Sequence, residues 1–84
     1  MARSRARKPL LMSFDGTLYP LESVREAAAA FGQVARVKVA RKGKRAEVTL
    51  APLEGAPEDE ILAGEFGNYA LGLAAQARRG SGTD

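Results

Sequence analysis

The side chains with which this chain could do chemistry are carboxylates, hydroxyls, phenols and cations, because its 84 residues include neither Cys nor His. Zinc fingers, catalytic triads and imidazole acid–base transfer are therefore excluded. The chain can form no disulfide, which fits a reducing compartment, and has no Cys to hold an iron–sulfur cluster. We expect no metal, no cofactor and no enzymatic activity.

Asp15 is the most suggestive of the remaining groups, since it lies in the segment Phe14-Asp15-Gly16-Thr17-Leu18 at the end of an apolar run. This segment resembles the D-x-D-G-T signature of haloacid dehalogenases, in which the first Asp is the nucleophile and the second is the acid–base. Ser13 stands in the place of that nucleophile, and the chain is too short for the doubly wound sheet of that family. Asp15-Gly16 instead predicts a turn in which the carboxylate accepts backbone N–H bonds.

A basic cluster surrounds Gly43 and consists of Arg41, Lys42, Lys44 and Arg45. Such a cluster could contact phosphates largely without sequence specificity. No aromatic residue flanks it on the expected strands, so the stacking platform of RNA-binding sheets is missing. Three interpretations remain open: a solvated hairpin tip, a contact for an acidic protein or peptide, and a nucleic-acid contact.

Five segments, in the order β-α-β-β-α, are expected to position these groups. Alternation in the first strand places Leu10, Met12 and Phe14 on one face and Leu11 and Ser13 on the other. The expected elements are a strand at 9–14, a helix at about 20–31, strands at 34–40 and 45–51, and a helix from Pro57 to Arg79.

The two middle strands flank Lys42-Gly43 and are expected to form a hairpin closed on those two residues. This register pairs Val39 with Ala46 and Lys38 with Glu47, which makes one face apolar and gives the other a complementary charge pair. The same register pairs Val37 with Val48 and Arg36 with Thr49.

Three glycines, Gly64, Gly67 and Gly72, lie inside the second helix, where each costs about 1 kcal/mol relative to Ala. They predict either close packing of the helix against the sheet or a surface that a partner backbone approaches.

We expect an α+β fold with a three-stranded sheet in the order 1-3-2 and both helices on one face. A right-handed crossover through the first helix makes strands one and two parallel. This arrangement resembles a ferredoxin-like fold that lacks its last strand. Residues 10–14 would form an exposed edge of the sheet. Residues 1–8 are expected to be a disordered basic arm, 9–79 a single domain and 80–84 a disordered tail.

The composition sets two further expectations. No apolar run approaches the roughly 20 residues of a membrane span, so we expect no membrane association and a cytoplasmic location. A chain of this size buries a modest core, so a partner that covers an exposed face or edge would matter for its stability.

Two separated segments carry a family resemblance. Leu18-Tyr19-Pro20-Leu21-Glu22 opens the first helix, and Glu65-Phe66-Gly67-Asn68-Tyr69 lies in the second. Together they resemble the HxsD family of the His-Xaa-Ser peptide system, over about residues 12–75. The chain departs from that pattern at Gly67, at Gly72 and at Ala29-Ala30. The residues that match are Leu18, Tyr19, Leu21, Glu22, Glu65, Phe66, Asn68 and Tyr69.

The resemblance implies an accessory protein that acts beside a radical-SAM enzyme which modifies a ribosomally made peptide. Its partner would be that maturase, the precursor peptide or both. The expected contacts are the edge strand Leu10, Leu11, Met12, Ser13 and Phe14, which could accept an extended peptide, and the basic cluster, which could attract an acidic segment. A small nucleic-acid-binding domain is the alternative function, and self-association through the edge strand or the second helix is a third expectation.

Overall fold

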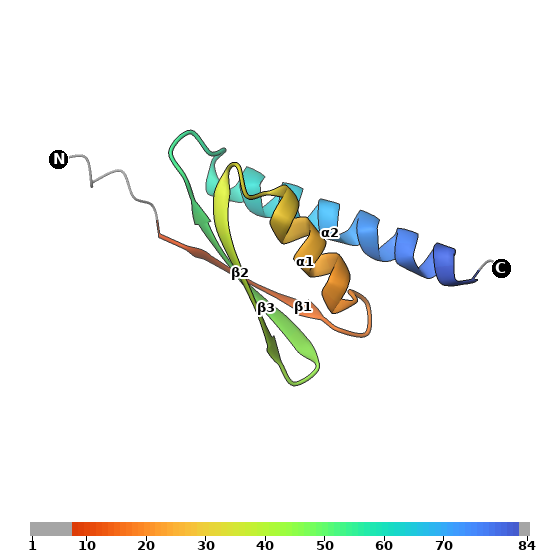
Figure 1. Cartoon of the computed structure of the whole chain (residues 1–84). Helices are drawn as coiled ribbons and strands as arrows, with labels where there is room; N and C mark the ends of the chain where they lie inside the picture. The colour runs from red at the N-terminus through yellow and green to blue at the C-terminus, as the bar shows by residue number, and fades with distance from the viewer. Residues whose placement is uncertain (1–7, 83–84) are drawn as a thin grey trace.

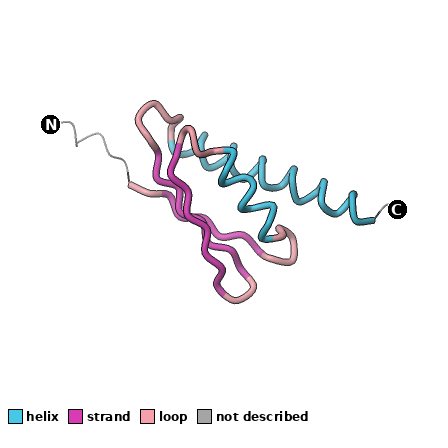
Figure 2. The backbone as a smooth tube through the Cα atoms, viewed as in Figure 1, coloured by secondary structure: helices cyan, strands magenta, loops and turns pink. Residues whose placement is uncertain are grey.

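The fold is given by a computed structural model, which describes residues 8–82 (Figures 1 and 2). The order of the elements is β-α-β-β-α, as the sequence pattern predicted. The elements are β1 (Leu10–Asp15), α1 (Leu21–Ala30), β2 (Ala35–Lys42), β3 (Arg45–Pro52) and α2 (Asp59–Gly82). Most of the expected basic arm lies outside the described residues, and α2 continues past Arg79 to Gly82.

The sheet has the order β1-β3-β2, and β3 pairs antiparallel with both neighbours. β1 and β2 therefore run parallel to one another on either side of β3. Both helices cover one face of this sheet, and α2 extends well beyond α1 (Figure 1). The arrangement confirms the expected α+β fold with strand order 1-3-2. It corresponds to the first five elements of a ferredoxin-like pattern, and no strand of residues 8–82 pairs with the free side of β1.

The hairpin register differs from the expected one by two residues. Val39 pairs with Val48, and Lys38 pairs with Thr49, so the predicted Lys38–Glu47 pair is wrong. The turn residues are Gly43 and Lys44. Gly43 has a φ of +62°, while no residue other than glycine has a positive φ in the described part of the chain. A two-residue turn with a positive φ only at its first position favours Gly at that position. The turn is therefore Gly43-Lys44 and not the expected Lys42-Gly43. Because the shift in pairing is two residues, the apolar face is preserved. The remaining correction is that Val37 pairs with Leu50 and Arg36 with Ala51.

Aromatic packing joins the sheet to both helices. Phe14 of β1 lies between the rings of Tyr19 and Phe66, with ring centroids 4.8 and 5.9 Å away. Phe31 lies between Phe66 and Tyr69, at 5.2 and 5.6 Å. These are all of the three Phe and two Tyr residues in the chain, which also has no Trp. The aromatic residues therefore contact one another on the helix side of the sheet, with Tyr69 45% exposed, and none is left for the sheet face opposite the helices.

The glycines of α2 are not explained by close packing. A Cβ at Gly64 or Gly72 would meet nothing within 4 Å, and one at Gly67 would make an ordinary contact of 3.9 Å with Met12. The helix packs instead through Leu62, Phe66, Ala70 and Ala74, all fully buried at a spacing of four residues. Within residues 8–82, neither helix combines the length and apolar character needed to cross a lipid bilayer.

Candidate functional site

β1 is one of the two edge strands of the sheet, since among the described strands it pairs only with β3, and β2 is the other. The Gly16 N–H donates to the Lys44 carbonyl at 2.8 Å, which continues the β1–β3 ladder by one pair. In an antiparallel ladder, bonded and non-bonded positions alternate, so the main-chain groups of Phe14 and Met12 also face β3. The N–H and C=O groups of Leu11 and Ser13 therefore point away from β3, toward the free edge.

The side chains of β1 alternate between the two faces of the sheet. Phe14 is buried against the helices, and Leu10 and Met12 pack at the margin of the core. Leu11 is 80% exposed on the sheet face away from the helices, which we call the open face. The expected edge residues therefore divide into two roles. Leu10, Met12 and Phe14 pack against the core, and Leu11 and Ser13 present main-chain groups to solvent.

The segment between β1 and α1, residues 16–20, is called the elbow. Asp15 shapes it, since its Oδ1 accepts bonds from the Thr17 N–H at 2.9 Å and the Thr17 hydroxyl at 2.8 Å. These two bonds, with help from the Arg45 and Lys44 charges, hold the pKa of Asp15 below its ordinary value of 3.8. The Asp15 carbonyl accepts from Leu18 and Tyr19. This carboxylate therefore closes a turn, as predicted, through the two bonds that its Oδ1 accepts from Thr17.

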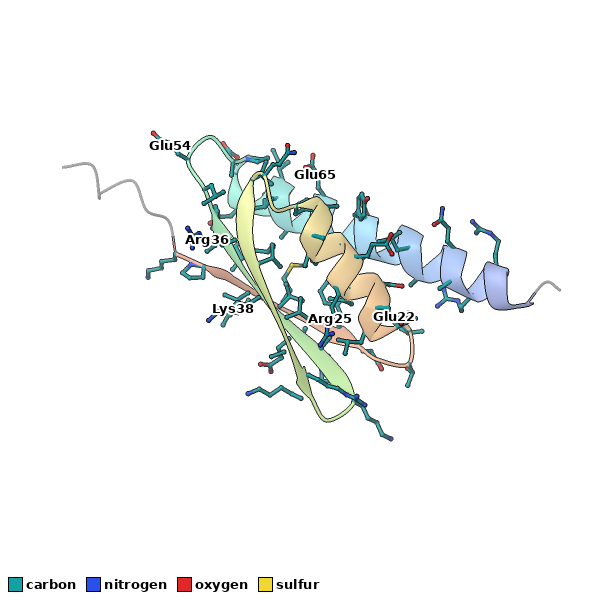
Figure 3. All side chains as sticks on the ribbon, viewed as in Figure 1. Glu22, Arg25, Arg36, Lys38, Glu54 and Glu65 are labelled. Carbon is teal, nitrogen blue, oxygen red and sulfur yellow. The ribbon has the colours of Figure 1, made fainter. Side chains whose placement is uncertain are left out.

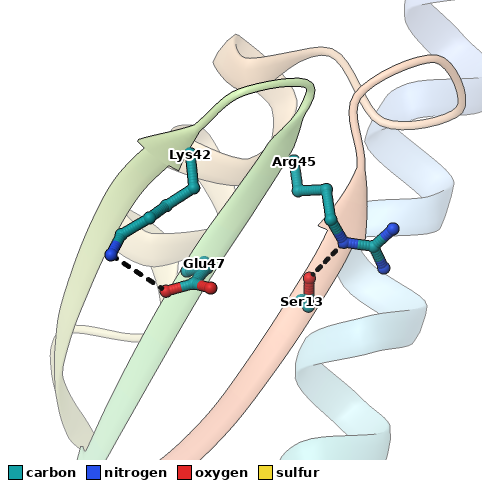
Figure 4. A network of polar contacts seen from close by, with 4 residues as sticks. All are labelled: Ser13, Lys42, Arg45 and Glu47. Carbon is teal, nitrogen blue, oxygen red and sulfur yellow. Dashed lines mark hydrogen bonds and ion pairs between the residues drawn. The ribbon is translucent and has the colours of Figure 1, made fainter.

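The basic cluster divides between two sides of the sheet. Lys42 and Arg45 lie on the open face, where the Lys42 ammonium is 3.9 Å from the Glu47 carboxylate (Figure 4). The Arg45 Nε donates to the Ser13 hydroxyl at 2.8 Å, across the β1–β3 pair (Figure 4). A bond between two exposed side chains of adjacent strands ties the edge strand to β3.

Arg41 and Lys44 lie instead beside the elbow. The Arg41 Nε donates to the Gly43 carbonyl at 3.3 Å, which holds this side chain against the turn. Neither side chain forms an ion pair with a carboxylate in the part of the chain that is described.

Two further cations share the open face with Lys42 and Arg45. Arg36 and Lys38 are exposed and project from β2 away from the helices (Figure 3). Glu47 is the acidic residue among them. Lys42, and not Lys38 as the sequence predicted, is the cation that lies beside Glu47.

The residues that carry the family resemblance differ in how far they are buried. Phe66 is fully buried, and Tyr19 and Leu21 are half-buried at the margin of the core. Leu18 is 55% exposed, and its carbonyl accepts a bond of 2.9 Å from the Arg78 guanidinium, which ties α2 to the elbow. The four others, Glu22, Glu65, Asn68 and Tyr69, are exposed on the two helices.

Across residues 8–82, no three His, Cys, Asp or Glu side chains lie close enough to hold a metal ion. Comparisons with models of protein families, with curated proteins and with solved structures gave no match to this chain.

Proposed function

We propose that this chain is a non-catalytic accessory protein that binds an extended peptide by strand addition at the free edge of β1. The observation that carries the proposal is the pair of outward main-chain sites at Leu11 and Ser13, on a strand with one neighbour. Strand addition draws its affinity from main-chain hydrogen bonds and does not require particular side chains. An added strand would occupy the place of the strand that completes a ferredoxin-like sheet.

The resemblance to the HxsD family supports a particular partner. It favours the precursor peptide of a ribosomal-peptide modification system, or the radical-SAM maturase that modifies it. Purified chain and either partner should form a complex at tens of micromolar, the affinity range of transient recognition. Flanking genes that encode neither a maturase nor a precursor peptide, or the absence of a complex with both partners, would contradict this assignment.

A proline substitution tests the edge itself. Ser13→Pro removes an N–H that faces the free edge and leaves the bonds between β1 and β3 in place, a position where edge strands tolerate proline. We expect this variant to bind the precursor peptide about tenfold more weakly, because one main-chain bond is lost and the ring obstructs the approaching strand. Isothermal titration calorimetry would measure the change.

Ser13→Ala is the matched control, because it also removes the Ser13 hydroxyl that bonds to Arg45 but retains the N–H. Its affinity should stay within about twofold of wild type, since that bond joins two exposed side chains. Circular dichroism would confirm that both variants are folded. Equal affinity of Ser13→Pro and wild type would show that the peptide does not use this edge.

Nucleic-acid binding is the second candidate, favoured by the cations Arg36, Lys38, Lys42 and Arg45 on the open face. It ranks second because the open face has no aromatic residue on which bases could stack. If this function holds, affinity for single-stranded RNA or DNA falls steeply as the salt concentration rises. It also falls when the four cations of the basic cluster around Gly43 are neutralised. Binding that is absent or insensitive to salt would eliminate it.

A further inference from the structure

A pocket of about 390 Å³ lies where the elbow meets the tip of the β2–β3 hairpin. We call it the elbow pocket. Residues 16–21 form one side of it, and residues 41–46 form the other. The residues that matter for its chemistry are Thr17, Tyr19, Leu21, Arg41, Lys44 and Ala46; Arg45 also borders the pocket, and its Nε donates to Ser13.

Positive charge dominates this pocket. Arg41 has one of its guanidinium donors engaged by the Gly43 carbonyl, and its remaining N–H groups have no carboxylate partner among the described residues. Lys44 likewise forms no ion pair within residues 8–82. Asp15 carries the opposing charge that interacts with Lys44, and its Oδ1 is bonded to Thr17. Two cations on one side of the pocket, neither in an ion pair within residues 8–82, favour an anion.

The two sides of the pocket are held in fixed positions relative to each other. The Gly16 N–H donates to the Lys44 carbonyl at 2.8 Å, so the elbow is bonded directly to the hairpin turn. The bonds between Asp15 and Thr17 fix the elbow, and the edge-on packing of Tyr19 against Phe14 fixes the phenol ring. A pocket fixed before its ligand arrives loses less entropy on binding than one that must be assembled.

Apolar groups complete the lining. Leu21 is the first residue of α1, and Ala46 lies at the start of β3 and is buried. Tyr19 and Leu21 give the side formed by residues 16–21 an apolar character, and Ala46 adds an apolar group on the side of the cations. Such a lining accommodates the carbon body of a ligand whose charged group reaches Arg41 and Lys44.

We infer that the elbow pocket binds a compact oxyanion, a phosphate or a carboxylate, carried on a small apolar body. The two chemistries share the same requirement, which is a planar or tetrahedral group of oxygens that Arg41 and Lys44 can bind together. This site is separate from the peptide edge, because no lining residue belongs to the free side of β1.

Titrations monitored by amide NMR test the inference with two probes, phenyl phosphate and benzoate. Both present an oxyanion on an aromatic ring, and inorganic phosphate serves as the probe without an apolar body. We expect saturable shifts at Gly16, Thr17 and Lys44 with a dissociation constant of about 1 mM, and weaker binding of inorganic phosphate. A stronger response to phenyl phosphate or to benzoate would identify the preferred oxyanion.

The double variant Arg41→Gln/Lys44→Gln should weaken binding of the preferred probe about tenfold or more. The control Arg36→Gln/Lys38→Gln removes the same charge from the open face and should leave affinity within about twofold of wild type. Shifts that do not saturate, or an equal loss in the control, would overturn the inference by showing only diffuse attraction to a basic surface. Retained affinity in Arg41→Gln/Lys44→Gln would overturn it as well.

Discussion

Asp15, Gly16 and Thr17 act together as a structural unit at the end of β1. Asp15 accepts both donors of Thr17, and Gly16 brings its backbone against Lys44 of the hairpin turn. A carboxylate whose Oδ1 serves the local turn is poorly placed for proton transfer to a ligand. The three residues therefore connect the edge strand, α1 and the hairpin.

Gly16 is the residue of this unit that tolerates substitution least. An added Cβ would collide with the Lys44 carbonyl, which is backbone and cannot rotate away. We expect Gly16→Ala to lower the free energy of unfolding by about 1–3 kcal/mol, as overpacking does. Denaturant titration would measure it. Gly64→Ala is the control, since its Cβ meets open space in a helix and should raise stability by about 1 kcal/mol. A neutral Gly16→Ala would show that the elbow and the turn are not in contact.

The pKa of Asp15 gives a prediction about pH. Because the folded pKa lies below 3.8, the stabilisation by the ionised carboxylate is present above that value and is lost as pH falls through the folded pKa. The melting temperature of wild type should exceed that of Asp15→Asn at neutral pH, and the gap should close under acid. NMR titration of the carboxyl should show a rise in pKa in Thr17→Val. An unchanged pKa in that variant would contradict the assigned cause.

Among the elements, β1 carries the free sheet edge to which the proposed peptide would add. Alternation in the first strand predicted which side chains face the helices, and the structure confirms this for Leu10, Met12 and Phe14. The hairpin register was not predictable from charge pairing, because the pairing of Lys38 with Glu47 had less influence than the positive φ of Gly43. The geometry of this turn thus set the pairing between β2 and β3.

The ladder alternation in β1 predicts a pattern of amide exchange in the free protein. The amides of Met12 and Phe14 bond to β3 and should exchange slowly, whereas those of Leu11 and Ser13 face solvent and should exchange quickly. Hydrogen exchange followed by NMR distinguishes these adjacent positions. Uniform protection along β1 would mean that the free edge is already covered, for instance by a second copy of the chain.

At the scale of the whole molecule, the order of elements, the strand order and the helix-covered face followed from periodicity, turn residues and helix-start signals. The elbow pocket did not, because its two sides, residues 16–21 and 41–46, are distant in sequence and meet only through the sheet. The glycines of α2 were also ambiguous in sequence. The open space beside Gly64 and Gly72 shows that close packing is not their role, and contact with a partner stays a prediction.

A small domain with an unfilled strand position should gain stability when the position is occupied. Peptide that binds only the folded chain raises the free energy of unfolding by about 2.7 kcal/mol at a concentration 100 times the dissociation constant. In thermal melts, the melting temperature of wild type should therefore rise as the concentration of precursor peptide increases. Ser13→Pro should show a smaller rise at the same peptide concentrations, and an equal rise in both would place the peptide elsewhere.

Strand addition at β1 is tested most directly by amide exchange at Leu11 and Ser13 with and without the bound precursor peptide. If the peptide adds to the sheet, both amides become protected in the complex, while Met12 and Phe14, already bonded to β3, change little. If the peptide binds and the Leu11 and Ser13 amides continue to exchange quickly, the free edge of β1 is not its binding site.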